Sequence, residues 1–238
     1  MTTQTAITLS SRTLEVLKNF STINSNILVK PGNVINTISP IKNVMAEATI
    51  EEDFDTEFGI WDLSKFLGTV SLFNKPEYEF HEKYVKIREE NNSTEVTYYY
   101  SEPRLLTTVN KKINMPETVV SCTLTQSVFS DILRAASVLQ VSDIAIRSNG
   151  EDIEIVALDK SDSTTNNYSV TIGDNSTSAD FNFYFKAENL KMLPGDYDIN
   201  ISDKVVSEFN RVNDDLTYWV ALESDSVYHG QNPYNSAI

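Results

Sequence analysis

Short runs of β-branched and aromatic residues alternate along the chain with a few longer helical patterns. Most of these runs span four to seven residues and are bounded by Gly, Asn, Asp or Ser, so they predict strands. The predicted strands are Ile27–Lys30, Val34–Ile38, Ala46–Ile50, Tyr84–Arg88, Glu95–Tyr100, Asp143–Arg147, Ile153–Leu158, Tyr168–Ile172, Asp180–Phe185, Asp196–Ile201 and Leu216–Leu222. The segment Ser148–Glu151, with Asn149-Gly150 at its centre, predicts a tight hairpin between two of them.

Four segments carry apolar residues at helical spacing: Ser10–Phe20, Asp62–Phe73, Thr125–Leu139 and Ala187–Leu193. The first three begin with a good N-cap residue, and the fourth ends where helices usually end, before Pro194. The residues expected on the buried faces are Leu14 and Leu17 in the first helix, Leu63, Phe66, Leu67 and Val70 in the second, and Val128, Ile132, Ala136 and Leu139 in the third.

The order of these elements repeats along the chain. Thr8-Leu9-Ser10 before the first helix resembles Thr123-Leu124-Thr125 before the third, and each helix is followed by a polar turn and a strand. The sequence therefore predicts two similar α+β domains: residues 1–108, followed by a connector to about residue 119, and residues 109–238, which end in a tail, 227–238.

Composition narrows the class of protein. The chain has 238 residues, 40% of them hydrophobic, and a formal net charge of −15, which excludes a collagen-like chain and a basic, polyanion-coating protein. A single cysteine, Cys122, excludes an intrachain disulfide and a cysteine-cluster zinc site, and we expect it to be a small buried residue in a reducing cytosol. With no signal-peptide pattern and no run of 18 apolar residues, we expect a soluble, intracellular protein without a membrane partner.

The four predicted helices differ from the rest of the chain in charge. They hold five basic residues against four acidic ones, so their net charge is +1 and the remainder carries −16. The basic residues are Arg12, Lys18, Lys65, Arg134 and Lys191. Helical geometry places each cation on a polar face, opposite the apolar stripe. By itself this pattern is also that of an ordinary solvated helix.

The sequence contains no complete catalytic or metal-binding motif. His81-Glu82 has Val85 where the zinc-protease pattern requires a second histidine, and the segment from Asp196 lacks the Gly and Glu of a calcium loop. The carboxylate pairs Asp53/Asp55 and Asp214/Asp215 could serve a hydrolase but are better explained as loop charge. No metal or cofactor is expected.

Four segments together resemble the sliding clamps of T-even-type bacteriophages. They are Leu17–Ser25, Trp61–Leu72, Leu190–Tyr197 and Tyr218–Ser226, in the order found in that family. The resemblance implies a ring-shaped homotrimer of two-domain subunits, each domain having antiparallel sheets outside and two helices on the inner face around duplex DNA. It implies a non-enzymatic DNA polymerase processivity factor, loaded by an ATP-driven clamp loader and also serving late transcription, in the cytoplasm of the infected bacterial host.

The resemblance also implies roles for particular residues. Lys18, Lys65 and Lys191 match lining positions that face DNA, to which Arg134 is added from its helical position, and Arg12. Subunits would join by pairing Glu95–Tyr100 (Tyr98, Tyr99, Tyr100) with Tyr168–Ile172 (Tyr168, Val170, Ile172) of the next copy, although an internal strand pair would explain the same runs. A pocket for partner peptides would involve Val44, Met45, Val109, Ile113, Met115 and Trp219, unless Trp219 and Met115 fill the core.

Two other functions remain open at this point: an acidic, carboxylate-dependent hydrolase and a structural phage protein built of β domains. The clamp differs from both because it needs no catalytic site. It needs only a weak attraction for phosphate inside the ring, which does not hold the DNA at one position, and an acidic surface outside the ring.

Overall fold

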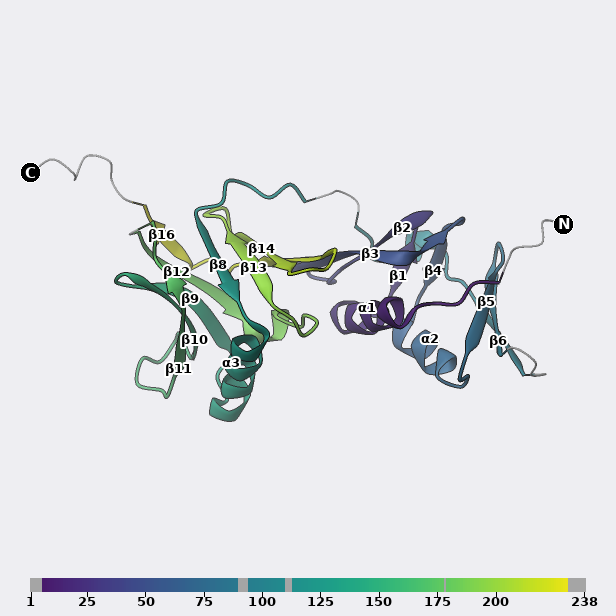
Figure 1. Cartoon of the computed structure of the whole chain (residues 1–238), viewed down its shortest axis with the longest axis horizontal. Coiled ribbons are helices and arrows are strands. Elements are labelled where there is room, and N and C mark those ends of the chain that lie inside the picture. Colours follow the sequence, from purple (N-terminus) through teal and green to yellow (C-terminus); the bar gives the residue numbers. More distant parts are fainter. Residues whose placement is uncertain (1–5, 90–93, 110–112, 178, 231–238) are drawn as a thin grey trace, which may run out of the picture. The chain divides into compact units, whose positions relative to one another are not determined.

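The computed structural model describes residues 6–89, 94–109, 113–177 and 179–230, so the predicted tail is described only as far as Gly230. The chain divides into two compact units, Met1–Lys112 (unit 1) and Ile113–Ile238 (unit 2) (Figure 1). Every strand pair described below is antiparallel.

In its described residues, unit 1 combines two α-helices with three groups of paired strands. Its elements are α1 (Ser11–Ile23), β1 (Ile27–Val29), β2 (Gly32–Ile38), β3 (Val44–Phe54), β4 (Phe58–Ile60), α2 (Leu63–Val70), β5 (Pro76–Phe80), β6 (Tyr84–Glu89), β7 (Glu95–Tyr99) and a 3-10 turn, η1 (Pro103–Leu105). Strand β1 pairs with β4, β2 pairs with β3, and β5, β6 and β7 form a sheet in that order. Helix α1 packs on β3 and α2, and both helices lie on the same side of the unit (Figure 1).

In its described residues, unit 2 holds one α-helix and two sheets. Its elements are β8 (Val120–Leu124), α3 (Gln126–Leu139), β9 (Asp143–Asn149), β10 (Asp152–Leu158), β11 (Tyr168–Asp174), β12 (Asp180–Lys186), a 3-10 turn, η2 (Ala187–Asn189), β13 (Tyr197–Ile201), β14 (Val206–Arg211), β15 (Leu216–Ala221) and β16 (Val227–His229). One sheet has the order β11-β10-β9-β12-β16, and β8, β13, β14 and β15 lie side by side in another. Helix α3 packs on β9, β10 and β11 (Figure 1).

Aromatic side chains form much of both cores. In unit 1, the rings of Phe54 and Phe58 meet edge to face at 5.2 Å, and both contact Phe80. In unit 2, the ring of Phe209 meets that of Phe185 at 5.8 Å, and all five of these side chains are buried. Burial of such rings supplies a large part of the hydrophobic stabilisation of a domain.

The predicted starts of the first three helices are confirmed. The side chain of Ser10 accepts a hydrogen bond from the backbone N–H of Thr13 (3.1 Å), and Asp62 accepts one from Lys65 (2.8 Å). Thr125 caps α3 in the same way. Each cap satisfies an N–H group that has no partner inside its helix. The predicted hairpin is also confirmed, because Asn149 pairs with Asp152 across a turn in which Gly150 has φ +66°.

Several details of the helices differ from the sequence prediction. Helix α1 continues to Ile23 rather than ending at Phe20, and Leu14 and Leu67, expected on buried faces, are only half-buried. Helix α2 ends at Val70 rather than Phe73, since the Ser71 hydroxyl donates to the Gly68 carbonyl and closes the last turn. In α3 the buried residues are Phe129, Ile132 and Ala136, whereas Val128 and Leu139 are only half-buried. The large Phe129 ring turns the buried face by one position, because it packs against Tyr197.

The predicted helix Ala187–Leu193 is wrong. Only the three residues of η2 form a helical turn there. Two tyrosine hydroxyls bind the backbone of Leu193 instead, because Tyr218 accepts from its N–H (3.2 Å) and Tyr197 donates to its carbonyl (2.5 Å). Leu190, Met192 and Leu193 are all buried, which is not the spacing of one helix face. A segment this short nucleates a helix poorly and follows its tertiary contacts.

The sequence prediction also missed five strands: β4, β5, β8, β14 and β16. These strands are short or carry polar residues at many positions, so their alternation is weak without the neighbouring strands. Within the described part of the chain, no helix combines the length and apolar character needed to cross a bilayer. Among the same residues, no group of three or more His, Cys, Asp or Glu side chains is arranged to hold a metal ion.

Candidate nucleic-acid interface

Lys18 and Lys65 are exposed on the two helices of unit 1. In α1 the residues Thr13, Val16, Leu17 and Phe20 are buried, so the helical period turns Lys18 toward solvent. Lys65 lies in the first turn of α2, beside the cap Asp62, and points away from the buried Leu63 and Phe66. Both positions agree with the helical-wheel prediction.

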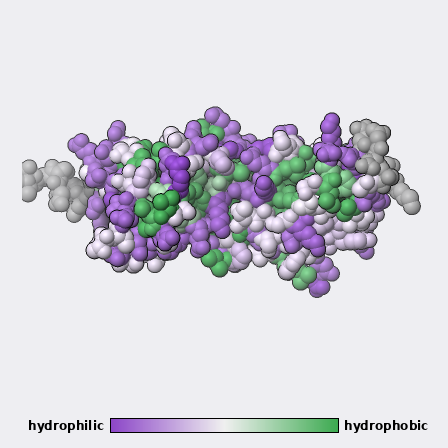
Figure 2. Space-filling model, turned by 90° about the horizontal axis from the view of Figure 1, so that it is seen from below, coloured by the Kyte–Doolittle hydropathy of each residue, from purple (hydrophilic) through white to green (hydrophobic). Residues whose placement is uncertain are grey.

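A groove runs between these two helices. It has a volume of about 580 Å³. Small polar residues and one cation line much of it, above an apolar floor. The residues are Leu14, Lys18 and Ser21 from α1, Ser64, Leu67, Gly68 and Val70 from α2, and Ser71, Phe73, Asn74 and Pro76 beyond it. Figure 2, a view from below, shows a mainly hydrophilic surface with separate apolar patches.

Sequence reasoning did not find this groove, although a signal for it was present. Ser64, Gly68 and Ser71 recur at intervals of four and three residues, which places them on one face of α2. Small residues on that face leave room for a groove beside Lys18. The relative position of α1 and α2 that creates it depends on contacts that the sequence does not display.

Arg12 differs from the two lysines because it is half-buried. Its neighbourhood is acidic and structured: the carboxylate of Glu52, on β3, accepts hydrogen bonds from the backbone N–H of Ser10 and the hydroxyl of Thr13. A carboxylate at this position suits the partial positive charge of a helix N-terminus. Arg12 lies in the first turn of α1 and is less exposed than Lys18 and Lys65.

On α3, Arg134 is exposed but paired. Its Nη2 donates to Oδ1 of Asp131, 2.6 Å away and one turn earlier. It also lines a second groove, of about 280 Å³, together with Asp131, Val138, Leu139, Asn167 and Tyr168. Ser127, Ser130 and Ser137 are exposed on the same helix, as the wheel predicts. The second groove was also missed by the sequence analysis, because it forms where α3 meets the start of β11.

Lys191 is exposed, but it lies on irregular chain between two buried residues, Leu190 and Met192. The prediction that it belongs to a helix is thus wrong, while its exposure agrees with the expectation. Its position depends on the tertiary packing of its neighbours and not on a helical face.

The electrostatic balance of the α-helices is opposite to that of the chain. The three α-helices contain Arg12, Lys18, Lys65 and Arg134 against Glu15 and Asp131, whereas the whole chain carries −15. Sparse cations among serines can attract phosphate, but they present no cluster of side chains that could read base edges. The arrangement suits weak, sequence-independent contact with a nucleic-acid backbone.

The two strands predicted to join subunits are each terminal in a sheet. Strand β7 ends the order β5-β6-β7, and β11 ends the larger sheet of unit 2. Tyr98 and Tyr100 turn inward, against Phe66 and Phe58 respectively, whereas Tyr99 is 71% exposed. On β11, Tyr168 is 39% exposed, and Val170 and Ile172 are half-buried.

The residues predicted to form a peptide pocket belong partly to unit 1 and partly to unit 2. Val44 and Met45, at the start of β3, are buried in unit 1, and Val109 is half-buried. In unit 2, Ile113 and Met115 are half-buried, and Trp219 is only 7% exposed. The indole N–H of Trp219 donates to Glu208 Oε1 at 3.1 Å, which satisfies its one donor.

Two family models match the two halves of the chain. A family model described as "gp45 sliding clamp, C terminal" matches residues 124–224, and one described as "DNA polymerase processivity factor" matches residues 10–113. The chain is 32% identical to the sliding clamp of Escherichia phage RB69 over 92% of this chain and 98% of that one. It is 31% identical to that of Enterobacteria phage T4, with the same coverage, and 29% identical to that of Vibrio phage KVP40, over 91% and 99%.

Solved structures share the fold at low sequence identity. Archaeoglobus fulgidus PCNA, determined with the C-terminal region of FEN-1, has a TM-score of 0.67 and 17% identity over 93% of this chain and 99% of that one. The Helicobacter pylori beta clamp, bound to a DNA ligase peptide, has a TM-score of 0.68 and 13% identity, over 94% and 67%. These findings decide between the three functions left open by the sequence: the chain belongs to the family of phage sliding clamps, the DNA polymerase processivity factors.

Proposed function

We propose that three copies of the chain close into a ring around duplex DNA, with α1, α2 and α3 of each copy toward the DNA. Lys18 and Lys65 face the phosphates directly, and Arg134, Lys191 and Arg12 contribute at the edges of this lining. Each copy supplies two clamp domains, 1–108 and 109–238. The observation that carries the proposal is the exposed cations on helices of an otherwise acidic chain.

The physical basis is retention without tight binding. A ring that must slide needs attraction for phosphate that is weak and independent of sequence. Isolated lysines beside serines provide such attraction, whereas the acidic remainder of the chain repels DNA from other surfaces. Arg134 contributes less charge than the lysines because Asp131 pairs with it.

Subunits would join through strand edges, β7 of one copy pairing with β11 of the next. Both strands are terminal in their sheets, and each exposes a tyrosine, Tyr99 or Tyr168. Val138, which is 75% exposed on α3, and Tyr168 lie on the groove beside β11 and offer it apolar surface. Exposed aromatic residues next to an open edge are typical of an interface.

The proposed partners are a DNA polymerase, an ATP-dependent clamp loader and late-transcription proteins, in the cytoplasm of an infected bacterium. The chain itself would have no catalytic activity and no cofactor. Partner peptides would bind near Val44, Met45, Val109, Ile113, Met115 and Trp219. The solved clamps that share the fold support this, since one was determined with a region of FEN-1 and another with a DNA ligase peptide.

Charge reversal on the helices tests the lining. The double variant Lys18→Glu/Lys65→Glu should fold but lose stimulation of DNA synthesis on long primed templates in the presence of the loader and polymerase. Lys30→Glu/Lys42→Glu is the matched control, because it makes the same change in net charge at exposed positions of unit 1 outside the helices. Equal loss of stimulation in both variants, or in neither, would reject the assignment.

A further inference from the structure

The larger sheet of unit 2 ends in two different ways. Strand β11 lies at one end, and the three-residue β16 lies at the other, beside β12. Without β16, β12 would be a terminal strand. Its segment Phe181–Phe185 is uncharged, and four of its five residues are aromatic. A run of this kind on an open edge readily pairs with strands of other molecules.

The C-terminal part of the described chain covers this edge. The N–H of Glu223 donates to the carbonyl of Tyr184 (2.8 Å), and the N–H of Tyr184 donates to Ser226 Oγ (2.9 Å). Strand β16 then continues along β12, where Tyr228 lies opposite Phe181. Both backbone groups of Tyr184 that an added strand would use are therefore already bonded.

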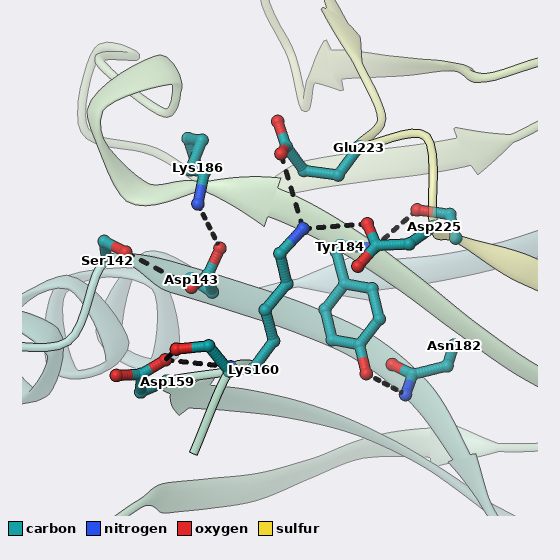
Figure 3. A network of polar contacts seen from close by, with 11 residues as sticks. Ser142, Asp143, Asp159, Lys160, Asn182, Tyr184, Lys186, Glu223 and Asp225 are labelled. Atoms are coloured by element: carbon teal, nitrogen blue, oxygen red, sulfur yellow. Dashed lines mark hydrogen bonds and ion pairs between the residues drawn. The ribbon is translucent and has the colours of Figure 1, made fainter.

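Lys160 pairs with two carboxylates of this covering segment (Figure 3). Lys160 Nζ, just after β10, lies 2.7 Å from Asp225 Oδ1 and 3.4 Å from Glu223 Oε2. It also lies 5.3 Å from the centre of the Tyr184 ring. Further along, the ring of Tyr228 is nearly parallel to that of Phe183, with centroids 6.4 Å apart. Ionic, aromatic and backbone contacts thus converge on a segment of seven residues, Glu223–His229.

We propose that Glu223–His229, which we call the edge cap, blocks strand addition at β12 and leaves β11 as the one end of this sheet, among its described strands, where a second copy can pair. This inference rests on the proposed ring. A subunit that is open at β7 and β11 closes with its neighbours into a ring. An open β12 edge would let additional copies attach there, and the assembly would branch or lengthen instead of closing.

The double variant Lys160→Met/Val227→Pro tests the edge cap in the full-length chain. It removes the cation and the N–H of Val227, which lies opposite Asn182 where the β12 backbone faces β16, and proline is poorly tolerated where a strand N–H faces its partner. In sedimentation velocity, we expect species larger than the wild-type assembly, growing with protein concentration. Lys204→Met is the matched control, since it also breaks a lysine–aspartate pair (3.0 Å to Asp203) and should sediment like the wild type. A double variant with only the wild-type mass at every concentration would overturn the proposal.

If the double variant does not fold, the single variant Lys160→Met tests the edge cap, and the measurement is amide hydrogen exchange. We expect the amide of Tyr184 to exchange about tenfold faster, because its protection depends on local opening of the cap, while the amides of β9 keep their wild-type rates. Unchanged exchange at Tyr184 would overturn the proposal. The wild-type mass is a separate result: a single-copy mass would refute the ring, whereas the cap is judged by comparing variants with the wild type.

Discussion

The hydroxyl of Tyr98 donates a 3.2 Å hydrogen bond to the backbone carbonyl of Asp62, the residue that caps α2. The Tyr98 ring also meets Phe66 edge to face at 5.2 Å. A strand proposed to join subunits is thus tied to the start of a helix proposed to face DNA. These contacts between β7 and α2 connect the two proposed surfaces of unit 1.

Removing only that hydrogen bond should destabilise unit 1 slightly. Tyr98→Phe keeps the ring and loses the hydroxyl, so we expect the free energy of unfolding to fall by about 0.5–1.5 kcal/mol in urea denaturation. The matched control is Tyr99→Phe, whose side chain is mostly exposed and should change stability by less than about 0.5 kcal/mol. Equal effects of the two substitutions would contradict the role of the Tyr98 hydroxyl.

Two glycines of unit 1 should respond to alanine in opposite directions. A Cβ at Gly59 would lie 2.8 Å from the backbone oxygen of Ser101 and 2.6 Å from Leu106 Cδ1, so Gly59→Ala should cost about 1–3 kcal/mol of unfolding free energy. A Cβ at Gly68, inside α2, would meet nothing within 4 Å, so Gly68→Ala should stabilise by about 0.5–1 kcal/mol. Urea unfolding of both variants checks this, and destabilisation by Gly68→Ala would contradict the prediction.

Stability should depend on Asp225 in acid. The hydrogen bond from Lys160 lowers the pKa of Asp225. In the folded chain that pKa lies below the value of about 3.9 for an unfolded aspartate. The stabilisation of the folded chain by the Lys160–Asp225 pair is therefore present above pH 4 and is lost as the pH falls through the lowered pKa. Asp225→Asn should therefore show a smaller loss of stability than the wild type between about pH 5 and pH 3, measured by urea unfolding. Parallel curves for the two proteins would refute the coupling.

Cys122 should be unreactive in the folded chain. It lies on β8 opposite Ile199 and is half-buried rather than fully buried as the sequence suggested, but burial raises the pKa of its thiol to about 12. At pH 8 only about one thiol in ten thousand would be ionised, against about a quarter in an unfolded chain. Iodoacetamide should label the protein in urea and not in native buffer, with Cys122→Ser as the blank. Rapid native labelling would show that β8 opens readily.

Charge placed on the proposed subunit edges should dissociate the ring. Tyr99→Lys on β7 and Tyr168→Lys on β11 each put a cation on an exposed interface position, so we expect the mass in light scattering to fall from three copies toward one. Val212→Lys, at an exposed apolar position outside both edges, is the control and should retain the wild-type mass. A trimer that survives both edge substitutions would exclude these strands as the joint.

Local signals in the sequence predicted much of the fold. Ser10, Asp62 and Thr125 cap helices as expected, and Gly150 turns the predicted hairpin. The exposure of Lys18 and Lys65 also follows from helical period alone. Each of these features depends on residues only a few positions apart, so its determinants stand next to one another in the sequence.

Other features arise from residues far apart along the chain. The hydroxyls of Tyr197 and Tyr218 bind the backbone of Leu193, which does not form a helix. Helices α1 and α2 form a groove only when they pack together. Lys160 reaches Asp225 across 65 positions, and Tyr184 reaches Ser226 across 42. Local spacing decides which segments can become helices or strands, because their backbone bonds and caps are short-range. Which edges stay open and which cations stay unpaired is decided by tertiary contacts, because a hydrogen bond or ion pair between distant residues leaves no periodic trace in the sequence.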